Sequence, residues 1–324
     1  MRLEVNQKNN KKILFTPGPG ALTLQNLEGL GPAFGRGDSD YDDVENRVLG
    51  KILEMSGQEK IVRMQGSASL AIEIGIRSFV YGRVLCVLGG AYSNRLKTIL
   101  NLKSLQRDVS TIDYIGFEEI DLIENAYDWI VSCYVETSIG IKVPIEELSA
   151  LAARCNSKLF LDATASIGLE DGHNKADVIA FSSCKGLFGL TGAAFICYNA
   201  KPSNTVDSFY MNLFTHEQKL VTGPYHQIQS LDKTLQIHAQ LRASVKANKF
   251  RALEKFRKYL PVEDKYQPLL CTRIQGELRY KDHRCVRYIP RVATDDSIVC
   301  HLGELHLGLE SRGDILDCVE VVNA

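Results

Sequence analysis

The sequence predicts an α/β fold built on a largely parallel sheet. Short apolar runs alternate with longer segments whose apolar residues repeat at helical spacing, which is the pattern of strands joined by helices. Three of the runs lie close together, at residues 159–161, 178–181 and 193–196, and glycine or polar residues bound each of them. Each run is short enough to be a buried strand, so we expect three strands in this part of the chain.

The N-terminal part predicts an extended segment and then a helix. Prolines and glycines alternate in Thr16-Pro17-Gly18-Pro19, which prevents a helix there. Acidic residues crowd into 38–43, where they suit the positive end of a helix whose apolar stripe covers 44–53 and ends near Gly57. The same acids do not match a calcium loop, because Asp43 stands where such a loop needs glycine.

A turn of small residues, Ser67-Ala68-Ser69, connects a run that begins at Val62 to a helix expected over 70–76. The free N–H groups at such a helix start can bind an anion, and a phosphate fits, although serine is also an ordinary N-cap. A strand expected over 83–90 then leads into a loop that carries Tyr92. This side chain could stack on a flat ring or pack locally.

The sequence pattern changes beyond residue 198. A long helical segment there would commonly link a large domain to a smaller one. The further expected elements are a strand at 128–133, helices at 144–155 and 208–218, one long helix or a broken pair at 231–260, and a final helix near 313–322. The expected domains are an N-terminal arm over 1–20, a large domain over 21–235, and a linking helix with a small C-terminal domain over 236–324.

Length, charge and cysteine content exclude several classes of protein. A chain of 324 residues can bury a large core and form two domains. With 38 basic and 39 acidic residues, the net charge of −1 gives no support to binding of nucleic acid or of anionic membranes. No apolar run approaches the length of a membrane span, and the polar N-terminus has no apolar signal core. Nine cysteines without a CxxC pair fit reduced, buried thiols in a cytoplasmic protein.

An acid and a lysine follow two of the predicted strands. Asp162 stands directly after the run at 159–161, and Lys185 stands four residues after the run at 178–181. Pyridoxal phosphate needs a lysine that forms a Schiff base with its aldehyde, and an acid beside its pyridine nitrogen. Strand ends are also where sheet-based folds place their sites. An ordinary surface lysine and an aspartate that begins a turn would give the same pattern, so this segment alone leaves both interpretations open.

Six short motifs extend this pattern over about residues 13–235. They are Thr16-Pro17-Gly18-Pro19, Gln65-Gly66-Ser67, Gly90-Ala91-Tyr92, Glu136-Thr137-Ser138-Ile139-Gly140, Asp162-Ala163-Thr164-Ala165-Ser166 and Ser182-Ser183-Cys184-Lys185. Each is weak alone, but together, in this order and spacing, they resemble the class V, fold-type I pyridoxal-phosphate aminotransferases. Within that family, the resemblance is to the 2-aminoethylphosphonate–pyruvate and alanine/serine–glyoxylate aminotransferases. It implies a large domain with a mostly parallel, seven-stranded sheet and a small C-terminal α+β domain.

The resemblance also implies a role for each matching residue. Lys185 would form the Schiff base and move a proton, and Asp162 would pair with the pyridine nitrogen. Thr222 would reach the phosphate in the other subunit, so that a homodimer shares its active sites. The other implied contacts are Ser67, Ala68 and Ser69 at the phosphate, Tyr92 stacked on the ring, Thr137 at the ring oxygen, Thr164 beneath the ring, and Cys184 where the family often has a phosphate-holding Gln or Asn.

The chain departs from the family near its end. The family usually carries an arginine there that binds the substrate's carboxylate or phosphonate, but the corresponding stretch, 297–304, has none. Either another cation serves or the substrate differs. Arg36, in a glycine-flanked turn, is the first candidate for this substrate-binding role, followed by Arg287 and Arg291. The histidines at 301 and 306 do not predict a metal site, because their spacing on a strand differs from that of the helical H-E-x-x-H site.

The sequence therefore predicts a transferase that uses pyridoxal phosphate to move an amino group. The donor would be a small amino acid or aminophosphonate, and the acceptor a 2-oxo acid or aldehyde. The alternative is a decarboxylase or lyase on a small amino acid, which the missing arginine favours, although Tyr92 and Cys184 replace the histidines usual in cysteine desulfurases. A non-catalytic paralogue is a third hypothesis, which the presence of Lys185 and Asp162 opposes.

Overall fold

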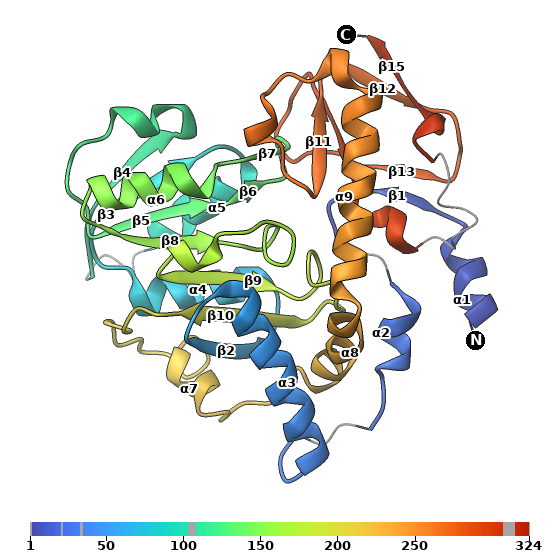
Figure 1. The fold of residues 1–324 in the computed structure, drawn as a ribbon. Coiled ribbons are helices and arrows are strands. Elements are labelled where there is room, and N and C mark those ends of the chain that lie inside the picture. Colours follow the sequence, from blue (N-terminus) through green and yellow to red (C-terminus); the bar gives the residue numbers. More distant parts are fainter. Residues whose placement is uncertain (1, 21, 33–34, 103–107, 307–314, 324) are drawn as a thin grey trace.

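The computed structural model describes residues 2–20, 22–32, 35–102, 108–306 and 315–323. A seven-stranded sheet lies at its centre, with the strand order β2-β10-β9-β8-β5-β3-β4 (Figure 1). Its strands are β2 (Lys60–Gln65), β3 (Gly82–Leu88), β4 (Val109–Gly116), β5 (Trp129–Cys133), β8 (Lys158–Asp162), β9 (Val178–Ser182) and β10 (Ala193–Tyr198). Only β10 is antiparallel to its neighbours within this sheet. The predicted α/β fold with a mostly parallel, seven-stranded sheet is confirmed.

Both faces of the sheet are buried, which explains why its strands are continuous apolar runs. In β3, Leu85 and Val87 pack into one hydrophobic cluster, while Val84 and Cys86 pack into another. Helices cover the two faces. The first cluster includes residues of α3 (Ser39–Ser56), α6 (Ile145–Arg154), α8 (Tyr225–Gln236) and α9 (His238–Lys255), and the second includes residues of α4 (Ala68–Phe79), α5 (Ala91–Leu100) and α7 (Leu213–Glu217).

The two ends of the chain lie together beside this sheet. Strand β1 (Ile13–Phe15) pairs in parallel with β13 (Cys285–Arg287), as Figure 1 shows. Two further antiparallel pairs complete this region, β11 (Cys271–Ile274) with β14 (Ser297–Cys300) and β12 (Glu277–Tyr280) with β15 (Val319–Asn323). Helix α9 leads into it from the large sheet (Figure 1). The exact domain limits at residues 20 and 235 stay predictions.

The remaining described elements are short. They are α1 (Arg2–Asn9), α2 (Leu24–Glu28), the hairpin of β6 (Val135–Glu136) and β7 (Ile141–Lys142), and the 3₁₀ helices η2 (Phe117–Leu122), η3 (His173–Lys175), η4 (Arg257–Tyr259), η5 (Asp264–Tyr266), η6 (Gly303–His306) and η8 (Ile315–Cys318). None of the helices in the described ranges is long and apolar enough to cross a membrane. All nine cysteines are free thiols, six of them buried.

Two expected elements need correction, and for the segment over 231–260 the structure decides between the two predicted alternatives. The segment over 208–218 is helical only in α7, because Asn212 caps that helix by accepting a hydrogen bond from the N–H of Phe214. The segment over 231–260 is a broken pair, with α8 already beginning at Tyr225 and a break at Ile237. The final helix expected near 313–322 is wrong. Residues 313 and 314 lie outside the described ranges, and the rest forms η8 and then β15.

The error at the C-terminus has a physical cause. Val319 and Val321 are separated by one polar residue, which is the alternation of a strand, and both contribute to the hydrophobic cluster of the C-terminal region. The backbone of this segment pairs with β12, whose own hydrogen-bonding groups would otherwise be exposed at a sheet edge. Pairing with β12 therefore decides the conformation of this segment.

Buried His173 makes the stability of the fold depend on pH. Its side chain is 2% exposed, its Nε2 lies 2.9 Å from the Ser166 hydroxyl, and the ring packs edge-on against Tyr134. Burial lowers the pKa of His173 to about 4. Since the unfolded chain has the ordinary, higher pKa, it binds the proton more readily than the folded chain does. The stability that neutral His173 provides is present above about pH 6.5 and is lost as the pH falls towards 4.

We expect the free energy of unfolding to fall by about 2 kcal/mol between pH 7 and pH 5 because of this group alone. Urea titrations at the two pH values measure the difference. His173→Gln should remove about this part of the pH dependence. His283→Gln is the matched control, because the side chain of His283 is 96% exposed. Equal pH dependence in the wild type and His173→Gln would contradict the explanation.

Candidate active site

A cavity of about 170 Å³ lies at the carboxyl ends of the central strands. This volume is close to that of an engineered protein cavity that holds one six-membered ring. Its walls come from the starts of α4 and α5 and from the segments that follow β5, β8 and β9. It is lined by Ser67, Ala68, Ser69, Tyr92, Arg95, Val135, Thr137, Asp162, Thr164, Ala165, Ser182, Cys184 and Lys185. Every residue predicted to contact the cofactor is therefore here, except Thr222.

Lys185 is held in a tight turn that follows β9. The turn is fixed by backbone hydrogen bonds from Phe188 N–H to the Lys185 carbonyl, 2.9 Å, and from Ser183 N–H to the Ala193 carbonyl of β10, 3.0 Å. Gly18 packs against the lysine side chain from the other side. A Cβ at Gly18 would lie 2.9 Å from Lys185 Cγ, and the φ of +132° also disfavours any other residue. The N-terminal Pro/Gly motif thus brings the backbone close to Lys185.

Asp162 ends β8 and is only 4% exposed. Its Oδ2 accepts a hydrogen bond from Arg95 at 2.7 Å, and its Oδ1 accepts one from the Thr164 backbone N–H at 3.0 Å. Arg95 also donates to the Ser69 hydroxyl at 3.0 Å. Burial lowers the pKa of the Arg95 guanidinium, but the Asp162 carboxylate more than offsets this, so the pKa is raised. A buried carboxylate is thus oriented by two donors on separate elements.

Tyr92 lies in the first turn of α5, so the loop predicted for it is wrong. The cause is the buried carboxylate of Glu136, which accepts hydrogen bonds from the N–H groups of Tyr92, at 3.1 Å, and Ser93, at 2.8 Å. An acid at this point suits the positive end of the helix and completes its unpaired donors. The Tyr92 ring centroid lies 5.3 Å from Lys185 Nζ and 5.3 Å from Arg95 Cζ.

Two features of the cavity wall fit the predicted cofactor. The Thr137 hydroxyl is fully buried and has no hydrogen-bond partner within the described residues, so it is available to a ligand. Helix α4 begins at the cavity, and its N-cap, Ser67, makes no side-chain capping bond, which leaves the first N–H groups for an anion. An aromatic ring beside Tyr92 with a phosphate at the start of α4 would match both. The residues present therefore fit pyridoxal phosphate.

Sequence reasoning missed Arg95 and the capping role of Glu136. Arg95 could have been found from helical spacing, because a residue three positions after Tyr92 lies on the same face of a helix. That inference required α5 to begin before Tyr92, whereas a loop was predicted there. For the capping role of Glu136, no local signal exists, since the helix N–H groups that it accepts from are more than 40 residues away in the sequence.

The residues predicted beyond the cofactor site lie in two groups. Thr222 and Arg36 are exposed, and Arg36 donates a hydrogen bond to the Lys219 carbonyl at 2.9 Å. Neither lines the cavity of its own chain. Arg291 does not line the cavity either, but its Cζ lies 5.9 Å from the ring centroid of Tyr92, which does. In the stretch where the family's arginine was expected, Ile298 is buried on β14, opposite Arg273.

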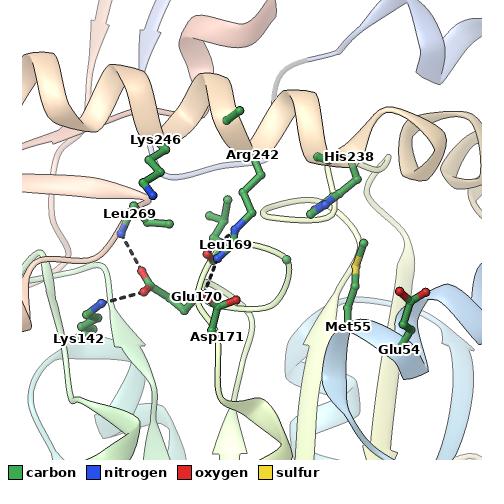
Figure 2. A pocket seen from close by; sticks show the side chains of 13 residues that line it. Glu54, Met55, Lys142, Leu169, Glu170, Asp171, His238, Arg242, Lys246 and Leu269 are labelled. Atoms are coloured by element: carbon green, nitrogen blue, oxygen red, sulfur yellow. Dashed lines mark hydrogen bonds and ion pairs between the residues drawn. The ribbon is translucent and has the colours of Figure 1, made fainter.

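A larger cavity, of about 740 Å³, lies between α9 and the segment that follows β8 (Figure 2). Its charges neutralise one another. Glu170 pairs with Lys142 at 2.8 Å and accepts from the Leu269 N–H at 2.7 Å, and Asp171 pairs with Arg242 at 2.8 Å, as the dashed lines in Figure 2 show. These contacts connect α9 and the C-terminal region to the large sheet. The smaller cavity, with Lys185 and Asp162, is the better candidate for catalysis.

Comparison with known proteins gave similarities in sequence and in structure, although no family model matches the chain. The 2-aminoethylphosphonate–pyruvate transaminase of Pseudomonas aeruginosa is 30% identical over 200 residues, which are 57% of this chain and 53% of that protein. The chain thus spans about half of the length of this relative. The crystal structure of alanine–glyoxylate aminotransferase from Nostoc sp. matches with a TM-score of 0.75 at 16% identity, covering 94% of this chain and 92% of that one.

A third similar protein has its cofactor in place. The crystal structure of phosphoserine aminotransferase from Trichomonas vaginalis, described as bound to PLP, matches with a TM-score of 0.69 at 13% identity. It covers 95% of this chain and 99% of that one. The resemblance predicted from the six motifs is confirmed by these comparisons, and the fold is that of the fold-type I aminotransferases.

Proposed function

We propose that this chain, which has the fold of the fold-type I pyridoxal-phosphate aminotransferases, is a class V member that transfers amino groups. The observation that carries the proposal is the cavity in which Lys185 and Asp162, from adjacent strand ends, meet the unpaired Thr137 hydroxyl and the start of α4. The donor is a small amino acid or an aminophosphonate, and the acceptor is a 2-oxo acid or an aldehyde. This substrate range rests on the sequence similarity to transaminases.

Each residue of the cavity has its own role in this proposal. Pyridoxal phosphate, when bound, supplies an aldehyde and a ring that withdraws electrons. Lys185 would hold the cofactor through its amine, and as a free amine it would carry a proton to and from the substrate's α-carbon. The Asp162 carboxylate would accept a hydrogen bond from the ring nitrogen and keep it protonated. Arg95 and Thr164 hold that carboxylate in place. Thr137 would donate to the ring oxygen, and Ser67, Ala68 and Ser69 would bind the phosphate.

Amino transfer is preferred to the other hypotheses for specific reasons. The similar proteins named above are transaminases and aminotransferases, which does not support the decarboxylase or lyase alternative. A non-catalytic paralogue would have no need of a lysine and a carboxylate in one cavity. Cys184 lines the cavity near Ser182, with the sulfur 3.5 Å from that hydroxyl, and replaces a Gln or Asn with a weaker phosphate ligand. The cytoplasm fits the nine free thiols.

The protein functions as a homodimer in this proposal. Phe209, Phe214 and Leu220 are 65%, 58% and 50% exposed, although large apolar side chains so close together are usually covered. The stretch that carries them lies near the phosphate turn, since the hydroxyl of Tyr210 donates to the Gln65 carbonyl at 3.2 Å. It leads directly to Thr222. A second copy seated on this surface would receive Thr222, and Arg36 beside it, at its own cavity.

Asp162→Asn tests the proposed chemistry. The variant should still bind pyridoxal phosphate but transfer amino groups at least roughly 100-fold more slowly, because an amide cannot keep the ring nitrogen protonated. The measurement is the rate of keto-acid formation from a panel of amino acids and aminophosphonates. Asp177→Asn is the matched control: it removes a carboxylate that accepts from Leu159 N–H at the opposite end of these strands. A near-normal rate in Asp162→Asn would refute the role.

Phe214→Asp tests the dimer. Phe214 and Phe250 are almost equally exposed, at 58% and 59%, but Phe250 lies on α9, away from the proposed interface. Sedimentation should show a dimeric wild type, a dimeric Phe250→Asp control, and a Phe214→Asp variant shifted to monomer with weaker cofactor binding. A wild-type monomer with full activity would rule out the shared site.

A further inference from the structure

A segment of the C-terminal region lies beside Tyr92, one of the residues that line the cavity. Tyr288 packs against the main hydrophobic cluster, and burial, together with the neighbouring Tyr92, raises the pKa of its hydroxyl, which is therefore neutral. Burial also raises the pKa of the Cys300 thiol on β14, an effect that the ammonium group of Lys185 opposes. The segment that follows β13 lies close to Tyr92, because Arg291 Cζ is 5.9 Å from the ring centroid, although the two residues are far apart in the sequence.

Arg291 is the cation of this segment that lies over Tyr92. It is exposed, and its guanidinium lies over the Tyr92 ring, with Cζ 5.9 Å from the ring centroid. Within the described ranges it makes no ion pair. Other arginines nearby differ in this respect, because Arg95 pairs with Asp162 and Arg273 pairs with Asp296 at 2.6 Å. Asp162 is the only carboxylate among the described residues that line the cavity, and it is paired with Arg95, so Arg291 adds a further positive charge beside Tyr92.

We infer that Arg291 binds an oxyanion of the substrate, a carboxylate or a phosphonate, and so determines which amino donors are accepted. The inference rests on the proposed function. A guanidinium that lies on an aromatic ring is held in one plane while its N–H groups remain directed outward, where they can bind two oxygens of one anion. A ligand bound there would lie beside Tyr92 and within reach of Lys185, which is 5.3 Å from the same ring.

Arg36 is placed differently. Its guanidinium donates to the Lys219 carbonyl, whereas the guanidinium of Arg291 lies over the Tyr92 ring. It could meet a substrate only in a partner subunit, whereas Arg291 belongs to the same chain as Lys185. Arg287, the other candidate, lies on β13 opposite Phe15 and is exposed. Because Arg287 is only four residues from Arg291, it provides a matched control for the loss of one exposed arginine from this region.

The test measures anion binding and catalysis separately. Isothermal titration calorimetry with pyruvate and with methylphosphonate, on the protein loaded with pyridoxal phosphate, should show binding to the wild type that weakens with added salt. Arg291→Ala should bind both probes roughly 10- to 100-fold more weakly, and Arg291→Lys should recover only part of the loss. Arg287→Ala should bind them as the wild type does, and Arg36→Ala tests the rival assignment of the anion site to Arg36. Cofactor absorbance should be the same in all variants.

Steady-state kinetics give the second readout. Arg291→Ala should raise KM for an anionic amino donor by a similar factor. The kcat for that donor, and the rate with a primary amine that carries no anionic group, should change little. The inference is overturned if the wild type binds neither probe, if Arg291→Ala binds them normally, or if Arg36→Ala alone weakens binding. Anion binding that depends on Arg291, without amino transfer from any donor, would contradict the proposed function and leave the anion site intact.

Discussion

The buried ion pair between Asp162 and Arg95 is the constraint on which the site depends. A carboxylate that is almost fully buried is costly unless a cation and further donors compensate it. Here Arg95 and Thr164 do so, at 2.7 and 3.0 Å. Arg95 can reach Asp162 only if α5 begins where it does, and the buried Glu136 carboxylate fixes that start. The Glu136 carboxylate thus positions α5, and Arg95 of that helix orients the Asp162 carboxylate. The first turn of the same helix places Tyr92 beside Lys185.

The cavity is assembled from parts of the chain that are distant in sequence. Gly18 packs on the Lys185 side chain, and it follows β1, whose partner strand β13 comes from the C-terminal region. That region also brings Arg291 to Tyr92. The ion pairs of the larger cavity, shown in Figure 2, connect α9 and Leu269 to the segment after β8. These contacts hold the C-terminal region against the large sheet. The position of Arg291 beside Tyr92 therefore depends on ion pairs that are far from Lys185.

Much of this arrangement could be predicted from the sequence because it rests on local patterns. The central strands are apolar runs bounded by turn residues, and the order of the six motifs predicted the residues that gather around Lys185. Contacts between distant segments could not be predicted in this way. Tyr92 was expected in a loop because the acid that starts its helix lies on another element. The C-terminal strand was expected as a helix because β12, its pairing partner, gives no signal in the segment itself. Arg36 and Arg291 could be ranked only once the fold showed which one faces Tyr92.

The most direct test of the account is to locate the lysine that carries the cofactor. Borohydride reduction of the protein loaded with pyridoxal phosphate, followed by peptide mapping, should place the pyridoxyl group on Lys185, because that amine lies in the cavity beside Tyr92. Lys185→Ala should lose the label and keep its fold. Lys142 and Lys246, which line the larger cavity of Figure 2, are internal controls and should stay unlabelled. A label on either of them, or on any lysine other than Lys185, would contradict the assignment of the active site.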